Sequence, residues 1–449
     1  MPGKKSKKTL VIGLGISGKA VAAFLARRGH EVHVVDSSSD EVLQQRAAEL
    51  STLGIQVDLG VKDLPLDVEL VVTSPGIPPL LLAPYRDKKI PVVGELEVGC
   101  NEIQVPIVAV TGTNGKSTVV TNIAEGLRQA GRKAAAIGNL GTPITEWIDS
   151  GRQADVVVIE VSSYQLETIE TFHPHIAVIL NIAPDHLGHH GSMEAYVAAK
   201  ARILQNQTIE DVLLLHRSLM DFPILQKTRG RLFWYGRDLK VSLDGLTLTG
   251  NQLAWRGGGP EWSRGVNTDG YFPHDVENIM ACVAVLATLG VDVDQAVRLF
   301  EHPVRLPHRL ELVAAVGGVT YINDSKATNA HAAIAALFST EGPLIWLVGG
   351  QGKGEDLAEL AAAARERKPR RVVCFGQDRL RFRDALAGHL PVEVKDSLQM
   401  AFAWASGAAA PGDTVLLAPA SASFDEFNSF EDRGEHFRKW VHELEARSS

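Results

Sequence analysis

The sequence predicts an α/β protein of three domains from its length, its composition and the order of its apolar segments. A chain of 449 residues has room for three domains of about 150 residues each. Hydrophobic residues make up 45% and charged residues 22%, a balance that is typical of globular chains and excludes disordered or collagen-like ones. Short apolar runs alternate with helix-like segments in three successive series, as they do in parallel α/β domains.

The charge balance argues against a general nucleic-acid or membrane partner. Lys and Arg total 45 against 53 Asp and Glu, a net charge of −8, whereas such partners are held by a basic excess. No segment approaches the ~18 consecutive apolar residues that a membrane-spanning helix needs. Glycines interrupt the N-terminal apolar run, so we do not expect a signal peptide. The three cysteines, Cys100, Cys282 and Cys374, are far apart and cannot all pair. We expect a monomer in a reducing cytoplasm, with no nucleic acid and no membrane insertion.

The first domain, residues 1–99, opens with a nucleotide-binding pattern. Its predicted elements are the strands 10–12, 31–35 and 69–73 and the helix 19–28. GLGISG (13–18), between the first strand and the helix, has Rossmann spacing, and Asp36 ends the next strand. On these residues alone, a dinucleotide site, another nucleotide site and a structural turn all stay open. The prolines of SPGIPP (74–79) predict a loop at a further strand end.

The second domain, residues 100–304, is predicted to be P-loop ATPase-like. TGTNGKST (111–118) joins a buried strand to an amphipathic helix, so its backbone N–H groups and the helix N-terminus would face phosphates. Lys116 can reach the β- and γ-phosphates, and Ser117 or Thr118 can bind magnesium. The loop departs from a standard Walker A motif because Val110 takes the position of the first glycine. A glycine turn with an incidental lysine is the alternative.

The rest of the second domain follows the same alternation. Its predicted elements are the strands 107–110, 155–161 and 176–180, the helices 117–129 and 277–289, and a small antiparallel insert over 213–267. Glu160, Asp185 and His186 end strands at the sheet edge where ligands gather, and Glu160 suits magnesium. An N-cap or solvated glutamate is the alternative for Glu160.

Several histidines raise the alternative of a zinc site. They are His186, His189 and His190, and also His173 and His175. No HExxH or CxxC spacing accompanies them, and the surrounding motifs are those of a phosphate-binding protein.

Lys200 occupies a position that should be apolar. In the predicted helix 193–204 it shares a face with Tyr196, Ile203 and Leu204. A lysine whose ammonium reaches water is one interpretation. The other is a desolvated amine with a lowered pKa, which stays neutral, adds carbon dioxide and becomes a carbamate that binds magnesium.

The third domain, residues 305–449, follows a proline-containing linker at 302–308. Its predicted strands are 319–323, 344–350, 370–376 and 413–419, again in a parallel, Rossmann-like α/β arrangement. NDSKATN (323–329) and GGQGKGED (349–356) leave strand ends, and we expect their lysines, Lys326 and Lys353, on neighbouring loops as a receptor for carboxylate or phosphate. Solvated surface lysines are the alternative.

Taken in order, TGTNGKST, EVSSYQLE, APDHLG, LPHRLE and NDSKATN make the whole chain resemble the Mur ligase family of ATP-dependent amide-bond synthetases in peptidoglycan precursor assembly. GLGISG, SPGIPP, GNLG and the ending PASASFDEFNSFEDRGEHF look most like the members that add D-glutamate. The DNPR-type motif of relatives that add diaminopimelate or lysine is absent. The resemblance implies a role in cell-wall biogenesis, and through it in cell shape and division.

The resemblance also implies roles for individual residues. The catalytic residues would be Lys116, His186 and Lys200, with ATP and magnesium as cofactors and a carbamylated Lys200. ATP would lie between the second and third domains, at Gly112, Thr113, Asn114, Gly115, Lys116, Ser117, Thr118, Asn278, Arg309 and Asp324. A UDP-sugar would lie at Gly15, Ile16, Ser17, Asp36, Ser37, Ser74, Asn139 and His186. Magnesium would bind Ser117, Glu160, His186 and Lys200, and D-glutamate would bind Lys326, Thr328, Lys353, Ser423 and Phe430.

The implied reaction joins D-glutamate to the L-alanyl carboxylate of a UDP-muramoyl substrate through an acyl phosphate. One departure concerns adenine binding, because His274-Asp275 stands where the family usually has His-Asn, which shifts that role to Asn278. The alternatives are an amide ligase of the folylpolyglutamate type, a dehydrogenase that uses GLGISG, and a nucleotide-binding switch without turnover.

Overall fold

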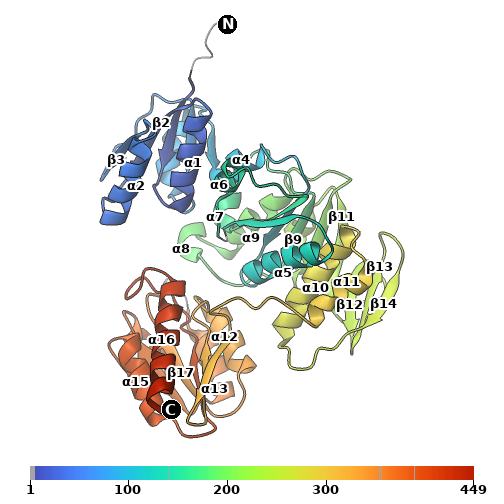
Figure 1. The fold of residues 1–449 in the computed structure, drawn as a ribbon, viewed down its shortest axis with the longest axis vertical. Coiled ribbons are helices and arrows are strands. Elements are labelled where there is room, and N and C mark those ends of the chain that lie inside the picture. Colours follow the sequence, from blue (N-terminus) through green and yellow to red (C-terminus); the bar gives the residue numbers. More distant parts are fainter. Residues whose placement is uncertain (1–5, 140, 353, 355, 389, 449) are drawn as a thin grey trace. The chain divides into compact units, whose positions relative to one another are not determined.

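The computed structural model describes residues 6–139, 141–352, 354, 356–388 and 390–448 (Figure 1). The predicted α/β fold is confirmed. The chain forms two compact units, the first running to Ile182 and resuming over His189–Pro303, the second comprising Ala183–Gly188 and the residues from Val304 on. Among the residues described, no helix combines the length and apolar character needed to cross a membrane.

A five-stranded parallel sheet begins the first unit, with strand order β3-β2-β1-β4-β5. Its elements are β1 (Lys8–Ile12), α1 (Ile16–Arg27), β2 (Glu31–Asp36), α2 (Glu41–Ser51), β3 (Gln56–Leu59), β4 (Leu70–Thr73), α3 (Pro79–Asp87), β5 (Val92–Gly94) and α4 (Glu95–Cys100). The prediction of a loop through all of SPGIPP is wrong at its end, because Pro79 begins α3. A proline is tolerated in the first turn of a helix, where its missing N–H has no intrahelical partner to lose.

A nine-stranded sheet forms the rest of the first unit, in the order β14-β13-β12-β11-β10-β9-β6-β8-β7. Its strands are β6 (Ile107–Thr111), β7 (Ala134–Gly138), β8 (Val156–Glu160), β9 (Ile176–Ile179), β10 (Val212–His216), β11 (Arg231–Arg237), β12 (Gly245–Thr249), β13 (Gln252–Arg256) and β14 (Trp262–Gly265). The predicted antiparallel insert is correct only for the pairs among β12, β13 and β14. It is wrong for β10 and β11, which pair in parallel and extend the main sheet.

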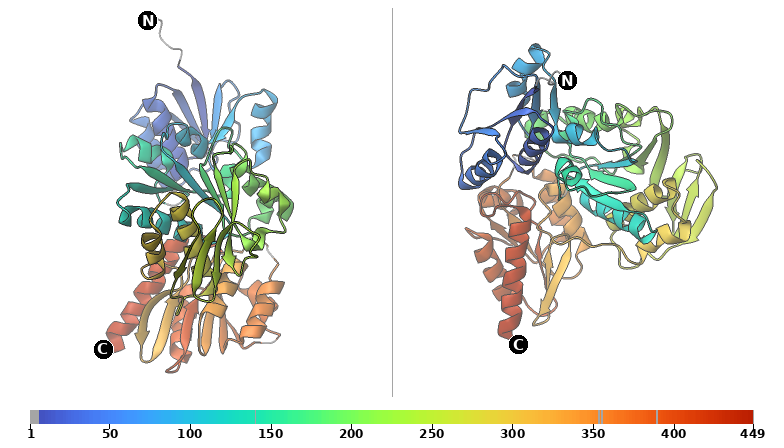
Figure 2. Two further views of the ribbon diagram at one scale, coloured as in Figure 1. Left: turned by 90° about the vertical axis from the view of Figure 1, so that its right-hand side faces the viewer. Right: turned by 45° about the horizontal axis from the view of Figure 1, so that its top comes forward.

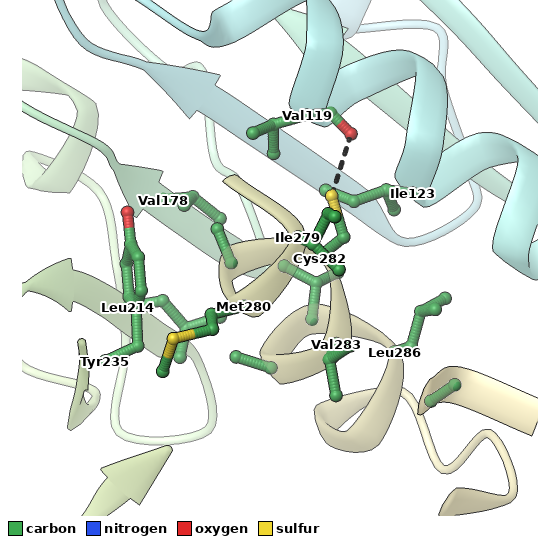
Figure 3. Close-up of a cluster of buried hydrophobic side chains, with 14 of the residues drawn as sticks. Val119, Ile123, Val178, Leu214, Tyr235, Ile279, Met280, Cys282, Val283 and Leu286 are labelled. Atoms are coloured by element: carbon green, nitrogen blue, oxygen red, sulfur yellow. Dashed lines mark hydrogen bonds between the residues drawn. The ribbon is translucent and has the colours of Figure 1, made fainter. Parts of the chain in front are cut away.

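Helices cover both faces of the nine-stranded sheet. They are α5 (Lys116–Gln129), α6 (Ile144–Asp149), α7 (Ser163–Leu166), α9 (Met193–Ala201), α10 (Pro273–Thr288) and α11 (Val293–Ala296), with short 3-10 turns at Arg202–Leu204, Arg217–Leu219, Pro223–Gln226 and Val297–Phe300. The short helix α8 (Leu187–His190) begins in the second unit and ends in the first. Figure 3 shows the core where α5 meets α10, with Cys282 pointing toward Val119 and Ile123, whereas Met280 points toward Tyr235. The Cys282 thiol donates a hydrogen bond of 3.6 Å to the Val119 carbonyl.

All three cysteines are buried and free, as the sequence predicts. Burial raises the pKa of the Cys100, Cys282 and Cys374 thiols, so each stays protonated and inert near neutral pH.

The second unit is built on a six-stranded sheet, in the order β15-β16-β20-β17-β18-β19. Its elements are β15 (Glu311–Val316), β16 (Val319–Asn323), α12 (Ala330–Ser339), β17 (Leu344–Gly349), α13 (Ala358–Arg367), β18 (Arg371–Phe375), α14 (Arg379–Leu386), β19 (Val392–Val394), α15 (Leu398–Ala408), β20 (Thr414–Leu417) and α16 (Phe430–Ser448). Only β15 is antiparallel to its neighbour. Figure 2 shows α16 running along this sheet, where it contacts β15 and β16.

The strand order bears on one expectation about the second unit. Because β20 lies between β16 and β17, the strands that precede NDSKATN and GGQGKGED are not adjacent in the sheet. The loop after β20, which carries Ser423, lies between the ends of those two strands.

Candidate active site

Gly112–Thr118, which we call the phosphate loop, connects β6 to α5. Gly112 and Gly115 have φ angles of 151° and 86°, which favour glycine. A Cβ atom at Gly115 would lie 2.5 Å from the Asn278 side-chain oxygen on α10. The loop therefore needs glycine at position 115, and it leads directly into the N-terminus of a 14-residue helix, which favours anions.

Asn181, which sequence reasoning missed, braces the phosphate loop from the end of β9. Its carbonyl accepts from the Thr113 N–H at 3.0 Å, and its side chain exchanges two hydrogen bonds with the Asn114 backbone, of 2.8 and 3.0 Å. The sequence feature that could have identified Asn181 is its position just after the apolar run of β9, at the same sheet edge as the loop.

Two lysine ammonium groups meet at one carbonyl of this loop. Lys116 Nζ donates to the Gly112 and Thr113 carbonyls at 2.9 and 2.8 Å, and Lys200 Nζ donates to the Gly112 carbonyl at 3.0 Å. Lys200 is 1% exposed, so the interpretation in which its ammonium reaches water is wrong. Its Nζ lies 4.6 Å from the ring centre of Tyr196, whose hydroxyl is 3.0 Å from Thr113 Oγ1.

Glu160 and Ser117 bring buried oxygen atoms to adjacent strand ends. β8 pairs with β6 so that Glu160 lies opposite Val110, and Ser117 is the second residue of the helix that follows β6. Glu160 is 3% exposed, which excludes a solvated glutamate, and its Oε1 accepts from the Asn139 side-chain amide at 2.8 Å. Carboxylate and hydroxyl oxygens are the ligands that Mg²⁺ prefers, so this pair fits the ion.

The candidate UDP-sugar residues of the first sheet gather at the ends of β1, β2 and β4. The Asp36 carboxylate accepts from the Leu14 N–H at 2.7 Å, and the Ser74 hydroxyl donates to the Gly13 carbonyl at 3.1 Å. A Cβ atom at Gly13 would lie 2.6 Å from Ser74 Oγ, so that glycine allows the two strand ends to approach. The remaining members stand at the start of α1 and just after β2: Gly15, Ile16, Ser17 and Ser37.

In the second unit, Lys326 and Phe430 form a contact near the ends of β16 and β20. Lys326 Nζ lies 3.6 Å from the centre of the Phe430 ring, and the Ser325 hydroxyl donates to the Phe430 carbonyl at 2.8 Å. Thr328 is half-buried and Ser423 is buried in the loops after these strands. Lys353 lies outside the described residues.

Arg433 on α16, also missed by sequence reasoning, ties these loops together. Its guanidinium is fully buried and donates to the Ser325 hydroxyl and carbonyl, both at 2.9 Å, and to the Ser421 and Ala422 carbonyls, both at 3.1 Å. Burial lowers the pKa of this guanidinium to about 9. The charged sequence around it, Glu431 to Glu435, carries no signal of burial.

His186, Arg309 and Asp324 also belong to the second unit. The Leu310 N–H donates to Asp324 Oδ1 at 3.2 Å, next to Arg309. His186 has a φ angle of 56°, and the Asp185 beside it accepts from the Asn329 side-chain amide at 3.3 Å. Since Lys200 lies in the first unit, a magnesium site shared by Lys200 and His186 stays a prediction.

Comparison with known proteins assigns all three matched parts of the chain to the same protein family. Profiles described as Mur ligase MurD-like N-terminal domain, Mur ligase middle domain, and Mur ligase glutamate ligase domain match residues 7–94, 110–238 and 308–421. A protein of Desulfosudis oleivorans named UDP-N-acetylmuramoylalanine–D-glutamate ligase is 38% identical, over 98% of this chain and 97% of its own. A protein of the same name from Pelotomaculum thermopropionicum is also 38% identical, over 97% of each chain.

Solved structures share the fold at lower identity. UDP-N-acetylmuramate-alanine ligase of Thermotoga maritima aligns with a TM-score of 0.61 at 17% identity, over 97% of this chain and 99% of its own. A pseudomurein peptide ligase of Methanothermus fervidus aligns with a TM-score of 0.58 at 18% identity, over 98% and 100% of the two chains. Both have the α/β fold described above.

Proposed function

This chain belongs to the Mur ligase family of ATP-dependent amide-bond ligases, and we propose that its described sites together add D-glutamate to UDP-N-acetylmuramoyl-L-alanine in peptidoglycan synthesis. The observation that carries the substrate assignment is the similarity, over nearly the full length, to relatives named for that reaction. The geometry supports it because the phosphate loop, the strand-end pocket of the first sheet and the Lys326 contact supply one site for each substrate.

The first half of the reaction activates the carboxylate. An oxygen of the L-alanyl carboxylate attacks the γ-phosphorus of ATP, which gives an acyl phosphate and releases ADP. The phosphate loop would hold the nucleotide through its N–H groups, with Lys116 turning from the Gly112 carbonyl to the phosphates. Asn278 faces the loop at Gly115, which supports its assignment to ATP in place of an asparagine at position 275.

Ser117 and Glu160 would hold magnesium, which when bound neutralises phosphate charge. We assign Lys200 a carbamate: its neutral amine bonds to the carbon of carbon dioxide and loses one proton. Burial of the amine favours this neutral form. Lys200→Ala should be inactive, and a short-chain carboxylic acid should restore part of the activity by filling the space that the carbamate leaves. An unmodified Lys200 in active enzyme, observed by mass spectrometry under carbon dioxide, would contradict this role.

The second half forms the amide. The neutral amine of D-glutamate attacks the acyl carbon, and inorganic phosphate leaves. Lys326 would bind a carboxylate of D-glutamate, with Thr328 and Ser423 as neutral donors and Phe430 as a wall. We retain Lys353 for the second carboxylate as a prediction from the sequence.

A substrate screen tests the proposed function. ADP release is followed while each UDP-muramoyl precursor is paired with each candidate amino acid and with a folate acceptor. Release should require both UDP-N-acetylmuramoyl-L-alanine and D-glutamate. Release with the folate acceptor would favour the folylpolyglutamate type, and ATP binding without release would favour a switch.

The first sheet allows a separate test. Calorimetry should detect binding of UDP-N-acetylmuramoyl-L-alanine and none of NAD. Tight binding of NAD alone would favour the dehydrogenase. The monomeric state, the cytoplasmic location and the domain limits at 99 and 304 stay predictions.

A further inference from the structure

Two adjacent histidines share one carboxylate in the first unit. His189 Nε2 lies 2.9 Å from one oxygen of Glu167, and His190 Nδ1 lies 3.0 Å from the other. The three ligand atoms all lie within 4.8 Å of one another. Of the candidate zinc ligands named from the sequence, the structure thus groups His189 and His190 with a glutamate that sequence reasoning did not include.

We propose that Glu167, His189 and His190 form a binding site for a divalent ion of the zinc class. Two imidazole nitrogens and a carboxylate oxygen are a ligand set that suits zinc, which then completes its coordination with water. Ligands about 2.0 to 2.1 Å from a tetrahedral ion lie roughly 3.4 Å from one another. The observed distances of 2.9 and 3.0 Å are close to this value, so small side-chain movements suffice to admit the ion.

The surroundings orient the two rings for this role. His190 Nε2 lies 3.0 Å from the Ser163 hydroxyl, so a proton on Nε2 can be donated to Ser163 when an ion takes the place of the proton between Nδ1 and Glu167. Tyr164 packs against both rings, with centroid distances of 4.5 Å to His189 and 5.6 Å to His190. Hydrogen bonds and packing outside the ligand set are what fix the orientation of metal-binding histidines.

The site also has a path of entry. Glu167 and Tyr164 line a small pocket, which Ser74 and Arg86 line as well. The Glu167 side chain is 28% exposed, whereas His190 is 1% exposed. An ion from solvent can therefore meet the carboxylate first and the imidazoles next.

The other histidine pair of the first unit lacks these features. His173 Nε2 lies 2.6 Å from Asp211, but His175 Nδ1 accepts from the Ile107 N–H at 3.2 Å and so has its lone pair in use. The Asp211 carboxylate also accepts from the Thr208 backbone and side chain. Among the described residues, the Glu167 side chain makes hydrogen bonds and ion pairs only with His189 and His190.

Zinc titration tests the proposal independently of ligase activity. Protein freed of metal is titrated with Zn²⁺ against a zinc-binding dye, with saturating Mg²⁺ to occupy the proposed nucleotide-metal site. The wild type should bind one zinc per chain. Glu167→Gln and His189→Ala should each weaken binding more than ~100-fold, and Ser163→Ala about 10- to 100-fold. The double variant His173→Ala, His175→Ala should bind as the wild type does.

Two further measurements distinguish loss of the zinc site from loss of the fold. Circular dichroism should show that Glu167→Gln, which preserves the shape of the side chain, is folded. Co²⁺ in place of zinc should give the strong visible absorption of a four-coordinate site in the wild type and not in Glu167→Gln. A wild type that binds no zinc in the presence of Mg²⁺ would overturn the proposal, as would a folded Glu167→Gln with unchanged affinity.

Discussion

The phosphate loop is shaped by its backbone, whereas the loop after β16, residues 324–329, is held by side chains. Gly112 and Gly115 give the phosphate loop conformations that other residues rarely adopt, and Asn181 braces it from the next strand. The 324–329 loop contains no glycine and depends on the Arg433 guanidinium, which reaches it from α16. The conformation of the phosphate loop is therefore determined by residues nearby in the sequence. The conformation of the 324–329 loop is determined only when the rest of the unit has folded.

Both loops carry a lysine, but the two lysines have different partners. Lys116 donates to backbone carbonyls of its own loop, whereas Lys326 lies over the ring of Phe430. A phosphate that enters the first loop can take over the Lys116 donors, because hydrogen bonds to a charged acceptor are stronger. In the proposed reaction, Lys326 would keep its ring contact while its ammonium binds a carboxylate. The two loops are therefore expected to serve different substrates.

The largest effect is expected from Lys116→Ala. Loss of a charge that stabilises the transferring phosphoryl group should lower kcat by at least ~10²- to 10³-fold with the fold intact. Lys133→Ala, an exposed lysine beyond the other end of α5, is the control and should leave kcat unchanged. Steady-state kinetics with circular dichroism measures both, and near-normal kcat in Lys116→Ala would refute the phosphate-loop assignment.

Gly115→Ala should act on ATP alone. The new methyl group would lie 2.5 Å from the Asn278 side chain at a positive φ angle, so the loop must shift. We expect the KM for ATP to rise at least ~10-fold and that for D-glutamate to stay within about twofold. Gly131→Ala, also at a positive φ angle but with open space around it, separates backbone strain from the clash. Equal effects of the two substitutions would show that the contact with Asn278 does not matter.

Arg433→Lys should act on D-glutamate. Lysine keeps the charge but cannot reach the Ser325, Ser421 and Ala422 acceptors at the same time. A weakened loop should raise the KM for D-glutamate about 10-fold with little change for ATP. Arg438→Lys, further along α16 and in a partly exposed ion pair, is the matched control. A rise in the ATP KM alone would place the loop at the nucleotide.

The smallest expected effect is a loss of stability at acid pH, which should arise at the 324–329 loop and not at the phosphate loop. His308 Nδ1 lies 2.9 Å from the Asn323 side-chain amide, and the His308 carbonyl accepts from the Lys326 N–H. Burial lowers the pKa of His308, so the unfolded chain binds more protons than the folded one just below the ordinary histidine pKa. The stability due to neutral His308 is present above pH ~6.5 and is lost as the pH falls below it.

Calorimetry of the wild type and His308→Asn between pH ~7.5 and ~5.5 measures this loss. The melting temperature of the second unit should fall more steeply with acid in the wild type than in the variant. Parallel curves for the two proteins would contradict the role of His308.

The difference between the loops also explains what the sequence could predict. The phosphate loop and the buried strands β6, β8 and β9 were recognisable because glycine spacing and continuous apolar runs are local signals. The parallel pairing of β10 and β11 was missed because nearby glycine-rich turns suggested hairpins. Arg433 was missed because its burial follows from contacts with residues 12 and 108 positions away, which no local pattern reports.

In the proposed reaction, the phosphoryl group of ATP passes to the L-alanyl carboxylate before D-glutamate attacks. This order of steps is tested most directly by labelling both oxygens of that carboxylate with oxygen-18 and analysing the released phosphate by mass spectrometry. If an acyl phosphate forms, its bridging oxygen comes from the carboxylate and leaves with the phosphorus when the amine attacks the carbon. Each released inorganic phosphate should then contain one labelled oxygen, and the amide product should contain the other. Phosphate without label would contradict it.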